Sequence, residues 1–117
     1  MTSDELKFRT KRFSLMIIDL VDKLPNTIAG RAVANQIVRS GTSVGANYRA
    51  VCRARSDREF IAKMTIVAEE SDETLFWLEI IMDKQYVSKS EVEYIWKEGN
   101  KLTAIFVSSL KTIKAKS

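Results

Sequence analysis

Residues 35–48 read Asn-Gln-Ile-Val-Arg-Ser-Gly-Thr-Ser-Val-Gly-Ala-Asn-Tyr, and the fold depends on whether this stretch is one helix or two. Inside a helix, Gly41 and Gly45 each cost about 1 kcal/mol relative to alanine. The helical spacing nevertheless continues through both glycines, along a face made of Val33, Ile37, Ser40, Val44, Asn47 and Val51. We therefore predict one long helix over residues 27–55, in which the glycines let a neighbouring helix or subunit approach closely. The alternative is two short helices broken by a turn at residues 40–43.

The segments on either side also have helical spacing and recognisable ends. A first helix is predicted over residues 4–24, with Ser3 as its candidate N-cap and Pro25 beyond its end. Two later starts have the serine-to-glutamate spacing of a capping box, Ser56 with Glu59 and Ser88 with Glu91.

These two starts predict further helices over residues 57–84 and 88–114. Four long helices with short connections predict an all-α fold, an antiparallel up-down-up-down four-helix bundle that forms one domain over residues 1–117. The amino terminus has no signal-peptide pattern, and no apolar run approaches the roughly 18 residues of a membrane span. We therefore expect a soluble, cytoplasmic protein without a membrane partner.

The composition argues against catalysis. The chain has no histidine, which excludes a Ser-His-Asp triad, a histidine-containing zinc site and the Glu-x-x-His pairs of bundle di-metal centres. The single cysteine, Cys52, excludes an intramolecular disulfide and is interpreted as a small interior or interface residue. We expect a protein that is not an enzyme and that uses no metal or cofactor.

Charge is divided unevenly along the chain. Residues 25–55 contain five arginines and no Asp, Glu or Lys: Arg31, Arg39, Arg49, Arg53 and Arg55. The following residues, 56–84, contain three basic and eight acidic residues and so carry a net charge of −5.

Most of the five arginines share one side of the predicted long helix, with Thr42 and Ala46 among them. Guanidinium groups separated by small residues suit a phosphate backbone, but an acidic neighbouring helix could equally pair with them. For Arg39 we favour the ion pair. For Arg49, Arg53 and Arg55 both an ion pair and an external anion remain open.

Two polar residues, Ser40 and Asn47, lie on the apolar face of the same helix. Since unpaired polar groups are costly there, we expect a buried hydrogen-bond network that includes Ser71 or Glu70. The aromatic residues exceed what a narrow bundle core requires, and some are expected to face a partner subunit: Phe76, Trp77, Tyr86, Tyr94 and Trp96.

Residues 35–48, followed by 54–56 and by Glu59-Phe60, resemble a known pattern, and so do residues 68–78. The chain is similar over nearly its whole length to bacterial four-helix-bundle proteins first noted in intervening sequences of 23S ribosomal RNA genes. The resemblance implies an antiparallel bundle that assembles into a ring-shaped homopentamer. A related protein, the accessory protein of diversity-generating retroelements, is a basic barrel that works with a reverse transcriptase and nucleic acid.

Two functions are therefore expected. The first is a non-catalytic, oligomeric accessory protein that binds RNA or DNA, alone or beside a reverse-transcriptase-type partner. Its phosphate contacts would come from Arg49, Arg53, Arg55, Lys111 and Lys114, with Lys116 nearby. The second is a structural or protein-interaction module without nucleic-acid binding, in which the arginines form salt bridges between subunits.

Overall fold

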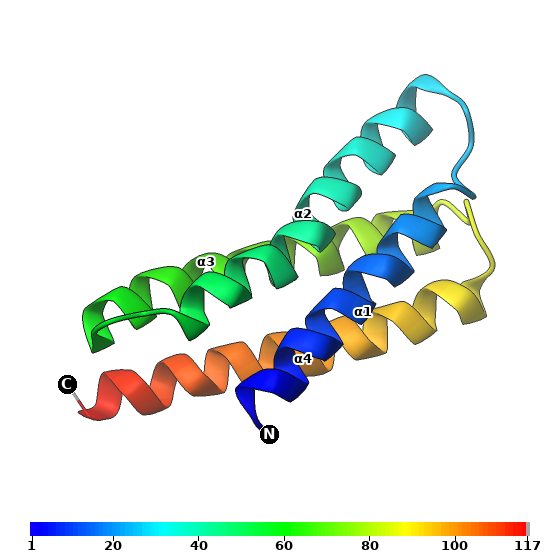
Figure 1. Ribbon diagram of the computed structural model, residues 1–117. Helices are drawn as coiled ribbons and strands as arrows, with labels where there is room; N and C mark the ends of the chain where they lie inside the picture. The colour runs from blue at the N-terminus through cyan, green and yellow to red at the C-terminus, as the bar shows by residue number, and fades with distance from the viewer. Residues whose placement is uncertain (117) are drawn as a thin grey trace.

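The chain forms four helices in an antiparallel up-down-up-down order (Figure 1). The structure is a computed structural model, and it describes residues 1–116. The helices are α1 (Ser3–Val21), α2 (Ile28–Cys52), α3 (Asp57–Asp83) and α4 (Lys89–Lys116). This architecture confirms the all-α four-helix prediction. The bundle is elongated, with extents of 47 × 22 × 21 Å.

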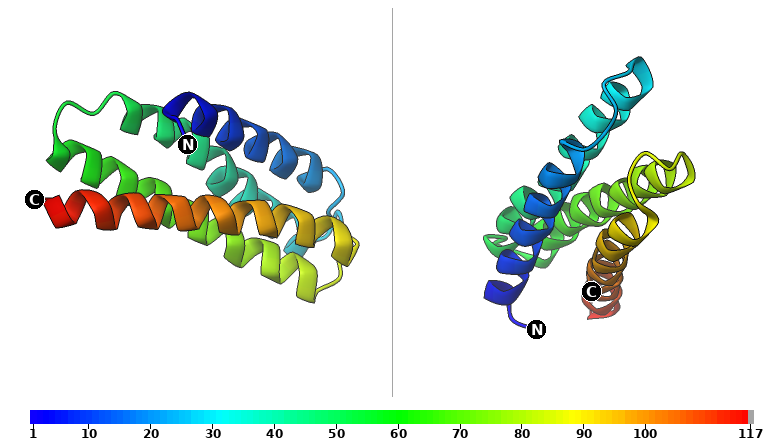
Figure 2. Two further views of the ribbon diagram at one scale, coloured as in Figure 1. Left: turned by 90° about the horizontal axis from the view of Figure 1, so that it is seen from below. Right: turned by 90° about the vertical axis from the view of Figure 1, so that its right-hand side faces the viewer.

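The four helices do not all pack against their neighbours to the same degree. α1 lies along α2, α2 along α3 and α3 along α4, whereas α1 and α4 make much less contact. Figure 2 shows that the α1–α2 hairpin crosses the α3–α4 hairpin at an angle. The side of the bundle between α1 and α4 is therefore the least tightly closed.

The first helix begins earlier and ends earlier than the sequence predicts. Thr2, rather than Ser3, is its N-cap, because Thr2 Oγ1 accepts a hydrogen bond from the Glu5 backbone N–H at 3.1 Å. After Val21 the hydrogen bonds change to the i→i+3 spacing of 3₁₀-type turns, in which the Leu24 N–H donates to the Val21 carbonyl at 3.2 Å. Such tightening satisfies carbonyls at a helix end and shortens the regular helix.

The second helix runs without a break through both glycines, and the reason is close packing against α1. A Cβ atom at Gly41 would lie 2.9 Å from the Ile17 side chain, and one at Gly45 would lie 3.3 Å from the Thr10 carbonyl group. Ser14 Oγ also donates to the Gly41 carbonyl at 3.1 Å. The glycines therefore allow α1, a helix of the same chain, to approach α2 closely. α2 ends at Cys52, which is half-buried.

The third helix starts at the predicted N-cap, where Ser56 Oγ accepts from the Glu59 N–H at 3.1 Å. The Glu59 side chain differs from the capping-box prediction, because Glu59 Oε2 accepts from the N–H of Arg55, one residue before the N-cap, at 3.4 Å. The fourth helix starts just after Ser88, the residue predicted to form a capping box with Glu91. The Glu91 carboxylate forms an ion pair with Lys23, which lies in the loop between α1 and α2. Glu91 thus contributes to tertiary structure.

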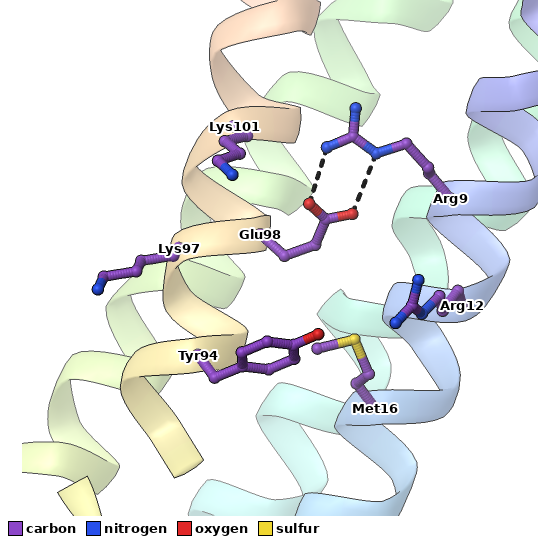
Figure 3. Close-up of a pocket in the computed structure, with 7 residues that line it drawn as sticks. All are labelled: Arg9, Arg12, Met16, Tyr94, Lys97, Glu98 and Lys101. Carbon is purple, nitrogen blue, oxygen red and sulfur yellow. Dashed lines mark hydrogen bonds and ion pairs between the residues drawn. The ribbon is translucent and has the colours of Figure 1, made fainter. Parts of the chain in front are cut away.

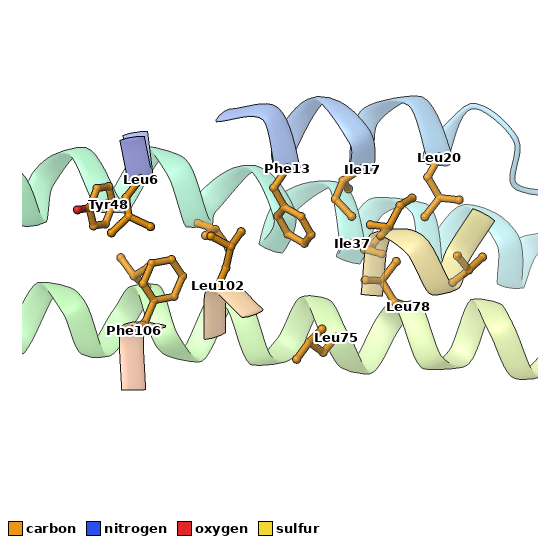
Figure 4. Packing of buried hydrophobic residues seen from close by; sticks show 14 of the residues in the cluster. Leu6, Phe13, Ile17, Leu20, Ile37, Tyr48, Leu75, Leu78, Leu102 and Phe106 are labelled. Atoms are coloured by element: carbon orange, nitrogen blue, oxygen red, sulfur yellow. The ribbon is translucent and has the colours of Figure 1, made fainter. Parts of the chain in front are cut away.

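A continuous apolar core fills the space between the helices (Figure 4). The largest fully buried side chains come from every helix and include Phe13, Ile17, Ile37, Leu78, Leu102 and Phe106. Burying each side chain of this size contributes about 1.5–3 kcal/mol. Trp77 and Trp96 are only partly buried and flank this core.

Three of the four buried polar residues take part in hydroxyl pairs, and the fourth, Thr10, donates to the Leu6 carbonyl of its own helix at 2.8 Å. Thr74 Oγ1 lies 2.9 Å from Ser40 Oγ and 2.8 Å from the Glu70 carbonyl oxygen. Ser71 Oγ lies 2.6 Å from Thr103 Oγ1 across the α3–α4 contact. Within residues 1–116, every buried side-chain nitrogen or oxygen has a partner.

The expected polar network thus differs in its members. Ser40 pairs with Thr74, not with Ser71, and Glu70 contributes its backbone carbonyl. Asn47 is half-buried and donates to the Ser43 carbonyl of its own helix at 2.8 Å, because its side chain turns back along α2.

Candidate nucleic-acid interface

A groove between α1 and α2 is lined by four basic side chains and by no acidic one. Its volume is about 470 Å³. Lys7, Lys11 and Ser14 line it from α1, and Thr42, Gly45, Ala46, Arg49 and Arg53 line it from α2. We call this feature the α1–α2 basic groove.

Helical spacing and close packing produce this arrangement. The two lysines are four residues apart on α1, and the two arginines are four residues apart on α2, so each pair lies on one helix face. The residues between the cations are small, since Gly45 packs against Thr10 at the point where the helices approach. The space at Gly45 is thus filled by α1, whereas Ala46 is exposed and leaves the α2 backbone accessible to a ligand.

The cations of this groove are largely uncompensated. Lys7 Nζ lies 3.9 Å from the Asp4 carboxylate, a highly exposed i,i+3 pair of the kind that contributes little. Among residues 1–116, no carboxylate forms an ion pair with Lys11, Arg49 or Arg53. The groove is therefore a site of concentrated positive charge that faces solvent.

The five predicted phosphate-binding residues do not gather at one place. Arg49 and Arg53 line the α1–α2 basic groove. Arg55 is exposed in the loop after α2, and Lys111 and Lys114 are exposed on α4, so these three lie outside the groove.

Lys7 and Lys11 line the α1–α2 basic groove but are not among the phosphate-binding residues predicted from the sequence. Their signal is the basic run in residues 7–12, Lys-Phe-Arg-Thr-Lys-Arg, in which the two lysines have the i,i+4 spacing of one helix face.

The earlier arginines of α2 are engaged within the chain. Arg39 Nη1 donates to Glu70 at 2.9 Å, and Arg39 also pairs with Glu73. The hydrogen bond from Arg39, together with one from the Trp77 indole at 3.1 Å, lowers the pKa of Glu73. Arg31 donates to Asn26 Oδ1 at 2.9 Å. The arginines of α2 thus form structural contacts near the start of the helix and are open cations near its end.

A second groove lies on the other side of α1, between α1 and α4 (Figure 3). It is lined by Arg9, Arg12, Met16, Tyr94, Lys97, Glu98 and Lys101, and we call it the α1–α4 groove. Arg9 donates two hydrogen bonds to Glu98, at 2.7 and 3.1 Å, and these hydrogen bonds raise the pKa of Arg9. This bidentate pair joins the two hairpins on their least closed side.

Charge also differs between the two ends of the bundle. The end that contains residues 1–12, 45–68 and 104–116 holds twelve basic and four acidic residues. The end that contains residues 13–44 and 69–103 holds seven basic and eleven acidic residues. We call these the basic end and the acidic end. The α1–α2 basic groove draws all four of its cations from the basic end.

A profile of 23S rRNA-intervening sequence proteins matches residues 5–108. The chain belongs to the 23S rRNA-intervening sequence protein family. A crystal structure of a protein of unknown function from the S23 ribosomal protein family of Bacteroides thetaiotaomicron VPI-5482 is similar, with a TM-score of 0.83 and 32% identity. The similarity covers 90% of this chain and 97% of that one. No curated protein matches the sequence.

The family assignment agrees with the resemblance seen in the sequence and with the observed bundle. Over residues 1–116, no helix of this family member is long and apolar enough to cross a membrane. Over the same residues, no three Cys, Asp or Glu side chains gather in a geometry that would hold a metal ion.

Proposed function

We propose that this member of the 23S rRNA-intervening sequence protein family is a non-catalytic protein that binds the phosphate backbone of RNA or DNA in the α1–α2 basic groove. The observation that carries the proposal is the convergence of four cations from two helices with no carboxylate among the lining residues. Lysine and arginine bind phosphate oxygens through charge-assisted hydrogen bonds, and arginine does so with a forked donor geometry.

The shape of the groove favours a chain of phosphates over a single small anion. The cations are spread over successive helical turns, so they present separate contacts along the groove. The excess of positive charge at the basic end would further attract a polyanion and increase its association rate.

Charge reversal in the groove tests the proposal. Fluorescence anisotropy with labelled RNA and DNA oligomers should give binding that weakens steeply between about 50 and 200 mM salt. The double variant Arg49→Glu/Arg53→Glu should weaken binding by at least about tenfold, because each contacted phosphate would then meet a negative charge.

The matched control is Lys111→Glu/Lys114→Glu, which changes the net charge equally at exposed positions of α4 outside the groove. It should weaken binding much less. Equal losses in the two variants would remove the special role of the groove, and salt-independent binding would contradict the whole proposal. Circular dichroism should first establish that both variants keep their helices.

A second candidate function is a homo-oligomeric interaction module, a ring-shaped assembly included. It is favoured by an outward row of apolar side chains on α1, formed by Phe8, Leu15 and Ile18, which are 68%, 53% and 40% exposed. Exposed apolar clusters of this kind mark interaction surfaces. Salt bridges from Arg39 do not support this candidate, because both carboxylate partners of Arg39 lie in its own chain.

A further inference from the structure

The α1–α4 groove combines an exposed aromatic ring with two cations, Arg12 and Lys101, that form no ion pair within residues 1–116. The Tyr94 side chain is 61% exposed, and its ring lies across the groove from Met16 and Arg12 (Figure 3). A tyrosine of a bundle surface gains little by exposing its ring to water, since burying apolar area is favourable. The Tyr94 ring is therefore accessible to a ligand, beside the charged residues that line the groove.

The charges of this groove divide into used and unused groups. Arg9 is held by both oxygens of Glu98, and Lys97 Nζ lies 3.5 Å from the Glu93 carboxylate. No carboxylate within residues 1–116 forms an ion pair with Arg12 or Lys101. The groove therefore holds two open cations, one on each helix. Arg12 lies across the groove from Tyr94, and Lys101 lies further along α4, beyond the Arg9–Glu98 pair (Figure 3).

The basic run at the start of α1 supplies both grooves at once. Lys7 and Lys11 line the α1–α2 basic groove, while Arg9 and Arg12 line the α1–α4 groove. The two grooves thus share α1 as a common wall. Because a base inside a duplex is paired and stacked on its neighbours, only an unpaired base could lie on an aromatic ring of the second groove.

We infer that the α1–α4 groove is a subsite for single-stranded nucleic acid, in which an unpaired base stacks on Tyr94 and successive phosphates of the strand contact Arg12 and Lys101. This inference rests on the proposed function and adds its substrate class. Single-stranded nucleic acids are generally bound by such pairings of cationic grooves with aromatic rings, because every base has a face that can stack. The α1–α2 basic groove has no aromatic lining residue, so it cannot supply this selectivity itself.

The first test compares single-stranded and duplex oligomers of equal length by fluorescence anisotropy. Tyr94→Ala should weaken single-strand binding by about tenfold, as expected for loss of one stacked base, and leave duplex binding within about twofold. Tyr94→Phe keeps the ring and should bind like the original protein. Phe76→Ala, which removes a ring that is 52% exposed on α3, is the matched control and should have no effect.

An abasic oligomer separates stacking from phosphate contact. The original protein and Tyr94→Ala should bind this oligomer equally, because no base is present to stack. Arg12→Ala/Lys101→Ala should instead weaken binding of both the abasic and the normal single strand, and should reduce the salt dependence.

The outcomes distinguish the inference from the proposed function. Salt-dependent binding that Arg49→Glu/Arg53→Glu abolishes, but that Tyr94→Ala leaves unchanged, would overturn the subsite and keep the function. A lower oligomeric mass of Tyr94→Ala in light scattering would assign the groove to a subunit contact and also overturn it. Absence of any salt-dependent binding would overturn both.

Discussion

The Glu73 carboxylate of α3 couples the stability of the fold to pH. Its carboxylate accepts hydrogen bonds from Arg39 of α2 and from the Trp77 indole of its own helix, and these contacts lower its pKa. The folded protein therefore binds a proton at Glu73 less readily than the unfolded chain does. The resulting stabilisation is present above the ordinary glutamate pKa of about 4.3 and is lost as the pH falls through the lower pKa of the folded state.

We predict that this coupling appears in the melting temperature. The melting temperature of the original protein should fall as the pH is lowered from about 5 to about 3, and that of Glu73→Gln should fall less because the titrating group is absent. Circular dichroism melts at several pH values measure this. Glu69→Gln, at an exposed position of the same helix, is the control. Parallel pH profiles for the original protein and Glu73→Gln would contradict the assignment.

At the scale of the elements, the glycines of α2 differ in how closely their neighbours approach. A Cβ atom at Gly30 would lie 2.1 Å from the Pro25 carbonyl oxygen, a backbone atom of the preceding loop. At Gly45 the nearest atoms belong to Thr10 and lie 3.3–3.4 Å away. The first contact cannot be accommodated unless the loop between α1 and α2 shifts, whereas the second requires only a small adjustment.

We therefore predict different outcomes for the two alanine substitutions. Gly30→Ala should lower the free energy of unfolding by about 1–3 kcal/mol, the usual range for overpacking. Gly45→Ala should be close to neutral, because a gain in helix propensity of about 1 kcal/mol offsets its tight contact. Urea denaturation monitored by circular dichroism measures both. A larger loss for Gly45→Ala would contradict this packing argument.

The same elements explain which features the sequence can predict. The continuity of α2 follows from its apolar face, because burial of that face outweighs the cost of Gly41 and Gly45. The ends of the helices are harder to predict from the sequence. Val21 and Cys52 are each followed by a tight turn, and no residue pattern distinguishes these turns from a further turn of helix. The type and order of the helices are therefore predictable, while their limits shift by up to three residues.

The candidate interface is predictable only from one side. Arg49 and Arg53 can be placed together from their spacing on α2, along with the small residues Thr42 and Ala46. The lysines that face them depend on the register between α1 and α2, which the contacts at Gly41 and Gly45 set. No pattern within α1 alone specifies that register.

At the scale of the whole molecule, the outward apolar row of α1 predicts self-association. Light scattering at micromolar concentration should give a mass above that of one chain. Replacing Leu15 and Ile18 by serine should lower that mass, because exposed positions of this kind contribute to an interface and not to the core. The control is Ile66→Ser, at an exposed apolar position of α3. A stable monomer would contradict the oligomeric module and any ring.

The unequal ends of the bundle have a further consequence. Positive and negative excess charge separated along a body 47 Å long make the molecule a permanent electric dipole. In the field of a polyanion such a body experiences a torque as well as an attraction. The torque would act before contact, once the protein is within a screening length of the polyanion, about 10 Å at 0.1 M salt. The protein would therefore turn its basic end toward the polyanion before it binds.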